Sequence, residues 1–113
     1  SELLYKKIGA GKETVIGKAC VGRTVEDIKE RFTEGDILVM SATDKDVVEY
    51  MEKASAIIVE EGGLTSHAFI VAMNLGKEVV VGAEGCLEKI KDGEVLTVNG
   101  NRGLVYRGEA RVL

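Results

Sequence analysis

Three short, uninterrupted apolar runs restrict the folds open to this chain of 113 residues. They occupy residues 37–40, 56–59 and 79–81. A strand that is apolar on both sides must be covered on both faces, which is typical of a parallel sheet enclosed between other layers. Helical patterns separate the runs, and strands that alternate with helices pair in parallel through right-handed crossovers. The middle of the chain therefore predicts a parallel sheet with crossover helices.

Cap signals mark where the crossover helices begin. Thr24 and Asp27 resemble a capping box, and apolar residues at helical spacing follow over residues 25–32 before Gly35 ends the pattern. A second cap at residues 43–46 precedes another apolar helical face. We expect Asp44, Lys45 and Asp46 to be a solvated helix start without a catalytic role.

The two ends of the chain have the pattern of β structure. A strand is expected over residues 14–21, and two strands flank the glycine-rich turn at residues 99–103, as in a hairpin. Since the chain has 14 glycines and no proline, glycine must form most of its turns. We therefore expect one domain spanning residues 1–113, of the α/β class, with a central mostly parallel sheet, crossover helices and an added β layer.

The only histidine of the chain follows a glycine turn and a pair of hydroxyl residues. Thr65 or Ser66 is expected to cap a helix that holds His67 in its first turn and stops at Gly76. Backbone N–H groups at a helix start point outward and favour an anion, and an imidazole beside them has the chemistry of a phosphate acceptor. The alternative is a capped helix start whose imidazole only packs locally. The candidate site consists of the nucleophile and the residues expected to bind phosphate: His67, Gly62, Gly63, Thr65 and Ser66.

Charge and composition argue against several classes of function. The net charge of −4, with lysine and arginine spread along the chain, argues against nonspecific nucleic-acid binding. No apolar run is long enough to span a membrane. Cys20 and Cys86 lie far apart, and no histidine is spaced as a metal partner. We therefore expect two free thiols in a reducing cytoplasm and no metal site.

Several motifs agree in order and spacing with a known family. They are Gly62-Gly63-x-Thr65-Ser66-His67, Gly76, Val79-Val80-Val81-Gly82, Asp92-Gly93-x-x-x-Thr97-Val98 and Gly103-x-Val105-Tyr106. Together they resemble the swivelling domain of phosphoenolpyruvate-utilising enzymes, which include pyruvate phosphate dikinase, phosphoenolpyruvate synthase and enzyme I of the sugar phosphotransferase system. The resemblance implies a swivelling β/β/α domain whose motif histidine, here His67, carries a phosphoryl group between distant active sites.

Parts of the chain are most similar to the extra C-terminal domain of some bacterial pyruvate kinases. These parts are residues 60–68, residues 35–39 with 43–46, and residues 106–113. The similarity implies an accessory module that contacts the catalytic body of a parent enzyme or a neighbouring subunit, with no nucleic-acid or membrane partner. The chain contains no recognisable ATP site, Mg²⁺ cluster or enolpyruvate site. The isolated domain is therefore expected to have no turnover and no cofactor, whereas the parent would use Mg²⁺ and a nucleotide.

The chain also departs from the phosphocarrier pattern. Met73 stands where phosphocarrier members commonly have an arginine that could pair with a phosphohistidine, and Glu61 places a negative charge near the site. Stabilisation of a phosphate would then fall to backbone N–H groups, the two hydroxyls and Lys77. Glu78 replaces a frequent proline, a departure expected to matter less.

Three classes of function remain open from the sequence. The first is an accessory module of a pyruvate kinase. The second is a phosphohistidine carrier domain of a pyruvate phosphate dikinase-like or phosphoenolpyruvate synthase-like transferase. The third, a stand-alone phosphate- or nucleotide-binding protein, is the weakest because no nucleotide fingerprint is present.

Overall fold

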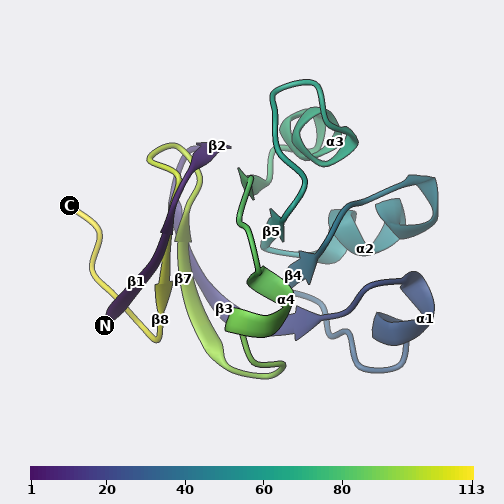
Figure 1. The fold of residues 1–113 in the computed structure, drawn as a ribbon, viewed down its shortest axis with the longest axis horizontal. Helices are drawn as coiled ribbons and strands as arrows, with labels where there is room; N and C mark the ends of the chain where they lie inside the picture. The colour runs from purple at the N-terminus through teal and green to yellow at the C-terminus, as the bar shows by residue number, and fades with distance from the viewer.

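The computed structural model describes residues 1–113 and arranges eight strands in the order β1-β8-β7-β3-β4-β5-β6-β2 (Figure 1). The strands are β1 Glu2–Lys6, β2 Ile8–Ala10, β3 Thr14–Val21, β4 Ile37–Met40, β5 Ala56–Val59, β6 Glu78–Val81, β7 Val95–Asn99 and β8 Leu104–Arg107. The helices are α1 Val25–Ile28, the 3₁₀ turn η1 Lys45–Val47, α2 Val48–Lys53, α3 His67–Leu75 and α4 Cys86–Lys89. None of these helices has the length and apolar character needed to cross a membrane.

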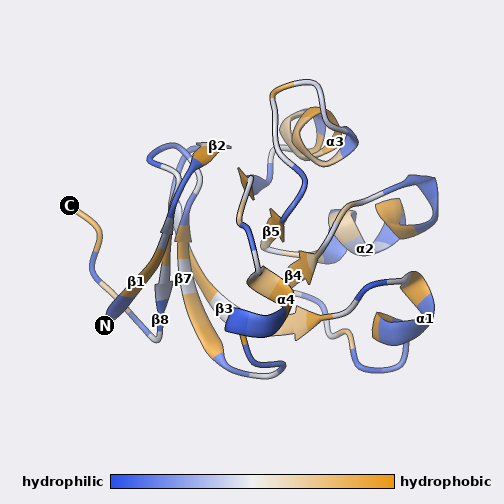
Figure 2. Cartoon of the chain, in the orientation of Figure 1, coloured by the Kyte–Doolittle hydropathy of each residue, from blue (hydrophilic) through white to orange (hydrophobic).

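The centre of the fold is the parallel set β3-β4-β5-β6, as the apolar runs predict. Ile58 and Val80 face the antiparallel strands, while Ile57 and Val79 face the helices, and all four are fully buried. Burial of each such side chain stabilises the fold by about 1.5–3 kcal/mol relative to exposure. Figure 2 shows the corresponding apolar colouring on β4 and β5. These strands are stable only where both faces are covered.

The long strand β3 joins the two halves of the sheet. Its first five residues pair with β7 in antiparallel fashion, and its last three pair with β4 in parallel. Gly17 lies before this change, where an added Cβ would approach Gly35 O to 3.0 Å. The antiparallel strands β3, β7, β8 and β1 form one layer, the parallel strands a second, and α1 to α3 a third (Figure 1). The predicted α/β class, with a mostly parallel centre and an added β layer, is confirmed.

Two local predictions differ from the structure. The capping box of Thr24 and Asp27 is present, but α1 ends at Ile28 instead of continuing to residue 32. Beyond Ile28 the chain continues in turns, with the N–H of Phe32 donating to the carbonyl of Ile28 at 2.8 Å, and the carboxylate of Asp36 then accepts the N–H of Thr33 at 3.0 Å. At the N-terminus, β1 and β2 form individual strands that the sequence pattern did not resolve.

A buried carboxylate ties the parallel sheet to the antiparallel layer. Glu78, at the start of β6, is only 3% exposed. Its Oε2 accepts the backbone N–H groups of Lys12 at 2.8 Å and Glu13 at 3.2 Å, and its Oε1 accepts that of Gly100 at 2.9 Å. These donors lie in the β2–β3 and β7–β8 turns. The replacement of proline by Glu78 therefore matters more to this fold than the sequence suggested.

We predict that Glu78→Ala lowers the free energy of unfolding by about 2–4 kcal/mol, because three backbone donors lose their acceptor. Urea denaturation followed by circular dichroism measures the change. Glu34→Ala is the matched control, since Glu34 is exposed and makes no side-chain hydrogen bond, and it should change stability by less than about 0.5 kcal/mol. Equal midpoints for the two variants would contradict the role given to Glu78.

Candidate functional site

The candidate histidine is the first residue of α3, as the capping pattern predicts. Ser66 is the N-cap, and its Oγ accepts the N–H of Phe69 at 3.3 Å while donating to the carbonyl of Gly63 at 3.0 Å. Gly76 ends the helix in the left-handed conformation, with φ of 70°. The only O–H donor of Ser66 is thus used within this chain.

Thr43 holds the imidazole from a neighbouring loop. Its Oγ1 lies 2.8 Å from Nδ1 of His67, and the threonine is buried. The loop after β4 supplies Thr43, and the loop after β5 leads to His67. Since β4 and β5 are adjacent and parallel, their carboxyl ends bring these two loops to the same edge of the sheet.

The expectation that Asp44, Lys45 and Asp46 form a solvated helix start agrees with the structure, in which all three residues are exposed. Asp44 does cap η1, accepting the N–H of Asp46 at 2.9 Å. Thr43, however, turns inward to the histidine. The sequence could have indicated Thr43, because it closely follows the buried strand at residues 37–40. The next buried strand, residues 56–59, leads to the histidine loop, and adjacent parallel strands bring the loops that follow them together.

The hydrogen bond between Thr43 and Nδ1 differentiates the two nitrogens of the His67 ring. Nδ1 is engaged, and no residue of the chain hydrogen-bonds Nε2. When Nδ1–H donates to Thr43, Nε2 carries the lone pair and is the nucleophilic nitrogen. An imidazole held in this way can attack an electrophilic phosphorus through Nε2.

The turn before the helix brings the remaining candidate residues together. Gly63 has φ of +104°, a conformation that favours glycine. A Cβ added at Gly62 would stand 3.5 Å from the Cα of Gly82, so this turn runs close to the end of β6. Thr65 is exposed, and its hydroxyl makes no hydrogen bond within the chain. Thr65 is therefore the hydroxyl available to a ligand, whereas that of Ser66 is occupied.

The loops next to the histidine contain more acidic than basic residues. Residues 41–45 and 60–65 include Asp44, Glu60 and Glu61, and Lys45 is their only lysine or arginine. The carboxylate of Glu60 accepts the N–H of Gly85 at 2.9 Å, beside Cys86 of the core shared with the antiparallel layer, so this charge is directed away from α3. None of these four side chains forms a hydrogen bond or an ion pair with His67.

Met73 and Lys77 lie away from the imidazole. Residue 73 is six positions after His67, about 9 Å along the helix axis and about 120° around it. Met73 and Lys77 instead line a hollow of about 280 Å³ with Lys12 and Asn101, at the other end of α3. The arginine missing at position 73 is therefore a weaker argument than the sequence indicated, and Lys77 does not serve the histidine.

The two thiols are not part of this site. Cys20 and Cys86 are free and buried, as expected for small core residues. Burial, with the nearby carboxylate of Glu60 adding to it, raises the pKa of the Cys86 thiol to about 12. This thiol is therefore protonated and unreactive at neutral pH.

Comparison with known proteins places this geometry among related domains. The family model described as "PEP-utilising enzyme, mobile domain" matches residues 32–103. A pyruvate kinase from Geobacillus stearothermophilus is 49% identical over 113 residues, which are 100% of this chain and 19% of that protein. A phosphoenolpyruvate synthase from Aeropyrum pernix is 44% identical over 110 residues, which are 97% of this chain and 13% of that protein. The chain thus spans about a fifth or less of the length of these relatives.

A solved structure supports the fold independently. The structure of an enzyme I protein determined by NMR superimposes with a TM-score of 0.60 at 21% sequence identity, covering 76% of this chain and 38% of that one. At this level of identity the likeness concerns the fold alone.

We predict that Thr43→Val changes the tautomer balance of the His67 ring, because Nδ1 loses its hydrogen-bonding partner. Long-range ¹H–¹⁵N spectra report the tautomer, and the single histidine of the chain gives an unambiguous set of signals. Thr43→Ser keeps the hydroxyl and should retain the original balance. Ring signals that are identical in all three proteins would show that Thr43 does not orient the histidine.

Proposed function

Because this chain belongs to the family of mobile domains from phosphoenolpyruvate-utilising enzymes, we propose that it is the C-terminal accessory domain of a pyruvate kinase. In this proposal the domain has a phosphohistidine-type motif at His67 but no complete active site. Its partner is the catalytic body of the parent enzyme or a neighbouring subunit, and the parent works in the cytoplasm, in glycolysis.

The observation that carries the proposal is the similarity to a pyruvate kinase along the whole chain, at 49% identity. A second pyruvate kinase, from Lactobacillus delbrueckii, is 48% identical over 94% of this chain. A domain that makes up about a fifth of such a protein leaves the binding of phosphoenolpyruvate and nucleotide to the remainder. Mg²⁺ and nucleotide are accordingly assigned to the parent and not to this domain.

The charges around His67 support an accessory role over an essential relay. A transferred phosphoryl group carries about 1.5 to 2 negative charges at neutral pH, and a relay must stabilise them at each stop. Here the adjoining loops supply three carboxylates, Asp44, Glu60 and Glu61, against one cation, Lys45. The N–H groups at a helix start contribute only about 1 kcal/mol at an exposed site.

The second candidate function is a phosphohistidine carrier in a transferase similar to phosphoenolpyruvate synthase. The hydrogen bond between Thr43 and His67 favours it, because it leaves Nε2 free to accept a phosphoryl group. The similarity to a phosphoenolpyruvate synthase at 44% identity is consistent with it. The parent chain distinguishes the two candidates, since a carrier requires an ATP-grasp domain upstream and an accessory domain requires a barrel kinase.

We predict that His67→Ala in the full-length parent leaves phosphoryl transfer from phosphoenolpyruvate to nucleotide within about twofold of the wild type. The reason is that chemistry proceeds in the catalytic body without passing through this domain. A coupled assay of turnover, with circular dichroism as the folding control, makes the measurement. A loss of about a thousandfold in a folded variant would establish His67 as the carrier.

We also predict weak phosphate binding at the turn before α3. Ser66 Oγ caps the N–H of Phe69, which leaves the N–H groups of His67 and Ala68 at the helix start for an anion. A phosphate titration followed by amide shifts should move these two signals with an affinity of about millimolar or weaker. Chloride at matched ionic strength is the control. If both amides stay still while others move, the anion site is absent.

A further inference from the structure

The outward surface of the antiparallel layer has a row of cross-strand neighbours with an exposed apolar side chain at each end. Leu3 of β1 pairs with Tyr106 of β8, Tyr106 pairs with Thr97 of β7, and Thr97 pairs with Ile16 of β3. These residues belong to neither buried core cluster, and Leu3 and Ile16 are 49% and 46% exposed. An antiparallel sheet with one solvated face normally presents polar side chains there.

The C-terminal segment, residues 108–113, is fastened over the middle of this row. The hydroxyl of Thr97 donates to the carbonyl of Gly108 at 2.7 Å and accepts the N–H of Ala110 at 2.8 Å. At the other strand edge, Ser1 Oγ donates to the carbonyl of Glu109 at 2.7 Å. The guanidinium of Arg102 donates to the carbonyl of Leu113. The segment is thus held from both ends, which gives the surface a fixed shape.

We define the outer face as Leu3, Ile16, Val95, Tyr106 and residues 108–113. It contains Leu3, Ile16, Val95 and Leu113, which are four of the eight exposed large apolar side chains of the chain. Three of the others, Leu64, Ile70 and Met73, lie on or just before α3. The outer face is therefore separate from the apolar side chains on and just before α3.

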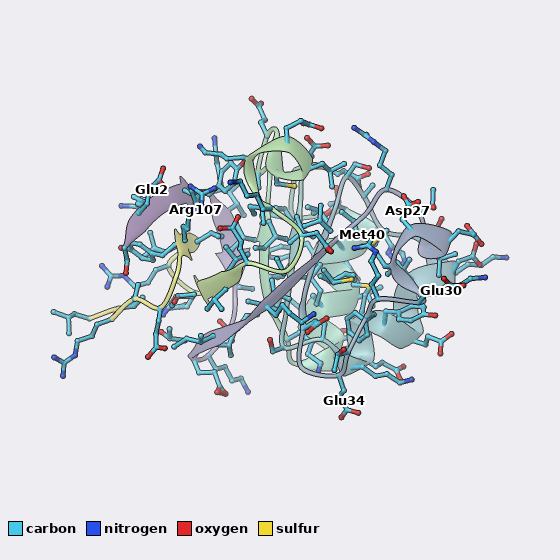
Figure 3. All side chains as sticks on the ribbon, turned by 90° about the horizontal axis from the view of Figure 1, so that it is seen from below. Glu2, Asp27, Glu30, Glu34, Met40 and Arg107 are labelled. Carbon is cyan, nitrogen blue, oxygen red and sulfur yellow. The ribbon has the colours of Figure 1, made fainter.

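The start of the chain lies on the outer face. β1 is the edge strand, Ser1 contacts the fastened C-terminal segment, and both termini lie on the antiparallel side of the molecule (Figure 1). The ion pair of Glu2 with Arg107, 2.6 Å long, fixes the first strand to β8 at this edge (Figure 3).

We propose that the outer face docks against the catalytic body of the same polypeptide. This inference rests on the proposed function, in which the catalytic body precedes Ser1. A body joined there is held next to the outer face by the connecting peptide at a high effective concentration. Because four hydrogen bonds already hold residues 108–113 on the sheet, docking has fewer residues to order. Docking through this surface leaves His67 and α3 on a free side of the domain.

Cysteine labelling in the full-length parent tests the proposal. Ile16→Cys reports on the outer face, and Ile70→Cys on α3 is a matched control, because the two side chains are 46% and 47% exposed in this domain. Cys20 and Cys86 are buried and give little background. Maleimide labelling, read peptide by peptide by mass spectrometry, should be about tenfold slower at Ile16→Cys than at Ile70→Cys. Val95→Cys should behave like Ile16→Cys.

Other outcomes overturn the proposal. Equal labelling rates, or protection of Ile70→Cys instead, would show that the outer face is not the docking surface. Protection at Ile16→Cys that disappears on dilution would identify a second copy of the protein as the occupant. Turnover of phosphoenolpyruvate measured on the unmodified parent tests the proposed function separately. A parent that lacks turnover but protects Ile16→Cys would overturn the proposed function and retain the docking surface.

Discussion

The burial of β4, β5 and β6 on both faces is the constraint on which the rest of this structure depends. Their side chains alternate between two cores, one shared with the antiparallel layer and one with the helices. Neither layer can be removed without exposing half of the sheet to water. The same parallel arrangement collects the loops that follow β4 and β5 at one edge, and there Thr43 meets His67. The parallel pairing of β4 and β5 therefore determines both the central core and the position of the candidate site.

At that edge of the sheet, the geometry around His67 suits a phosphate acceptor, but the charges of the neighbouring loops do not. The helix cap, the glycine turn and the hydrogen bond between Thr43 and Nδ1 leave one ring nitrogen held and the other free, which is the geometry that a phosphate-accepting histidine needs. The adjoining loops nevertheless contain three carboxylates, one lysine (Lys45) and no arginine. A fold that serves as a swivelling phosphocarrier can keep its backbone geometry while losing the charges that stabilise a phosphoryl group. We interpret this chain as such a case, within a family that its sequence identifies.

Local signals predicted the fold well, whereas contacts between distant segments were not predictable. Apolar runs gave the parallel strands, and Ser66 and Gly76 gave the ends of α3, because caps and periodicity depend on neighbouring residues. The contact of Thr43 with His67 depends on strand register, and the three hydrogen bonds to Glu78 depend on two turns far away in sequence. The position of Met73 relative to the imidazole also required the structure. The phosphate-binding roles of Gly62, Gly63, Thr65 and Ser66 stay predictions.

The central claim is that this domain accompanies phosphoryl transfer without relaying it. The most direct measurement incubates the full-length parent with phosphoenolpyruvate labelled in its phosphoryl group, stops the reaction in alkali, and maps the label by peptide. Our account predicts that less than about a tenth of the chains carry label on His67 while turnover proceeds. Stoichiometric labelling of His67 within a single turnover would contradict it.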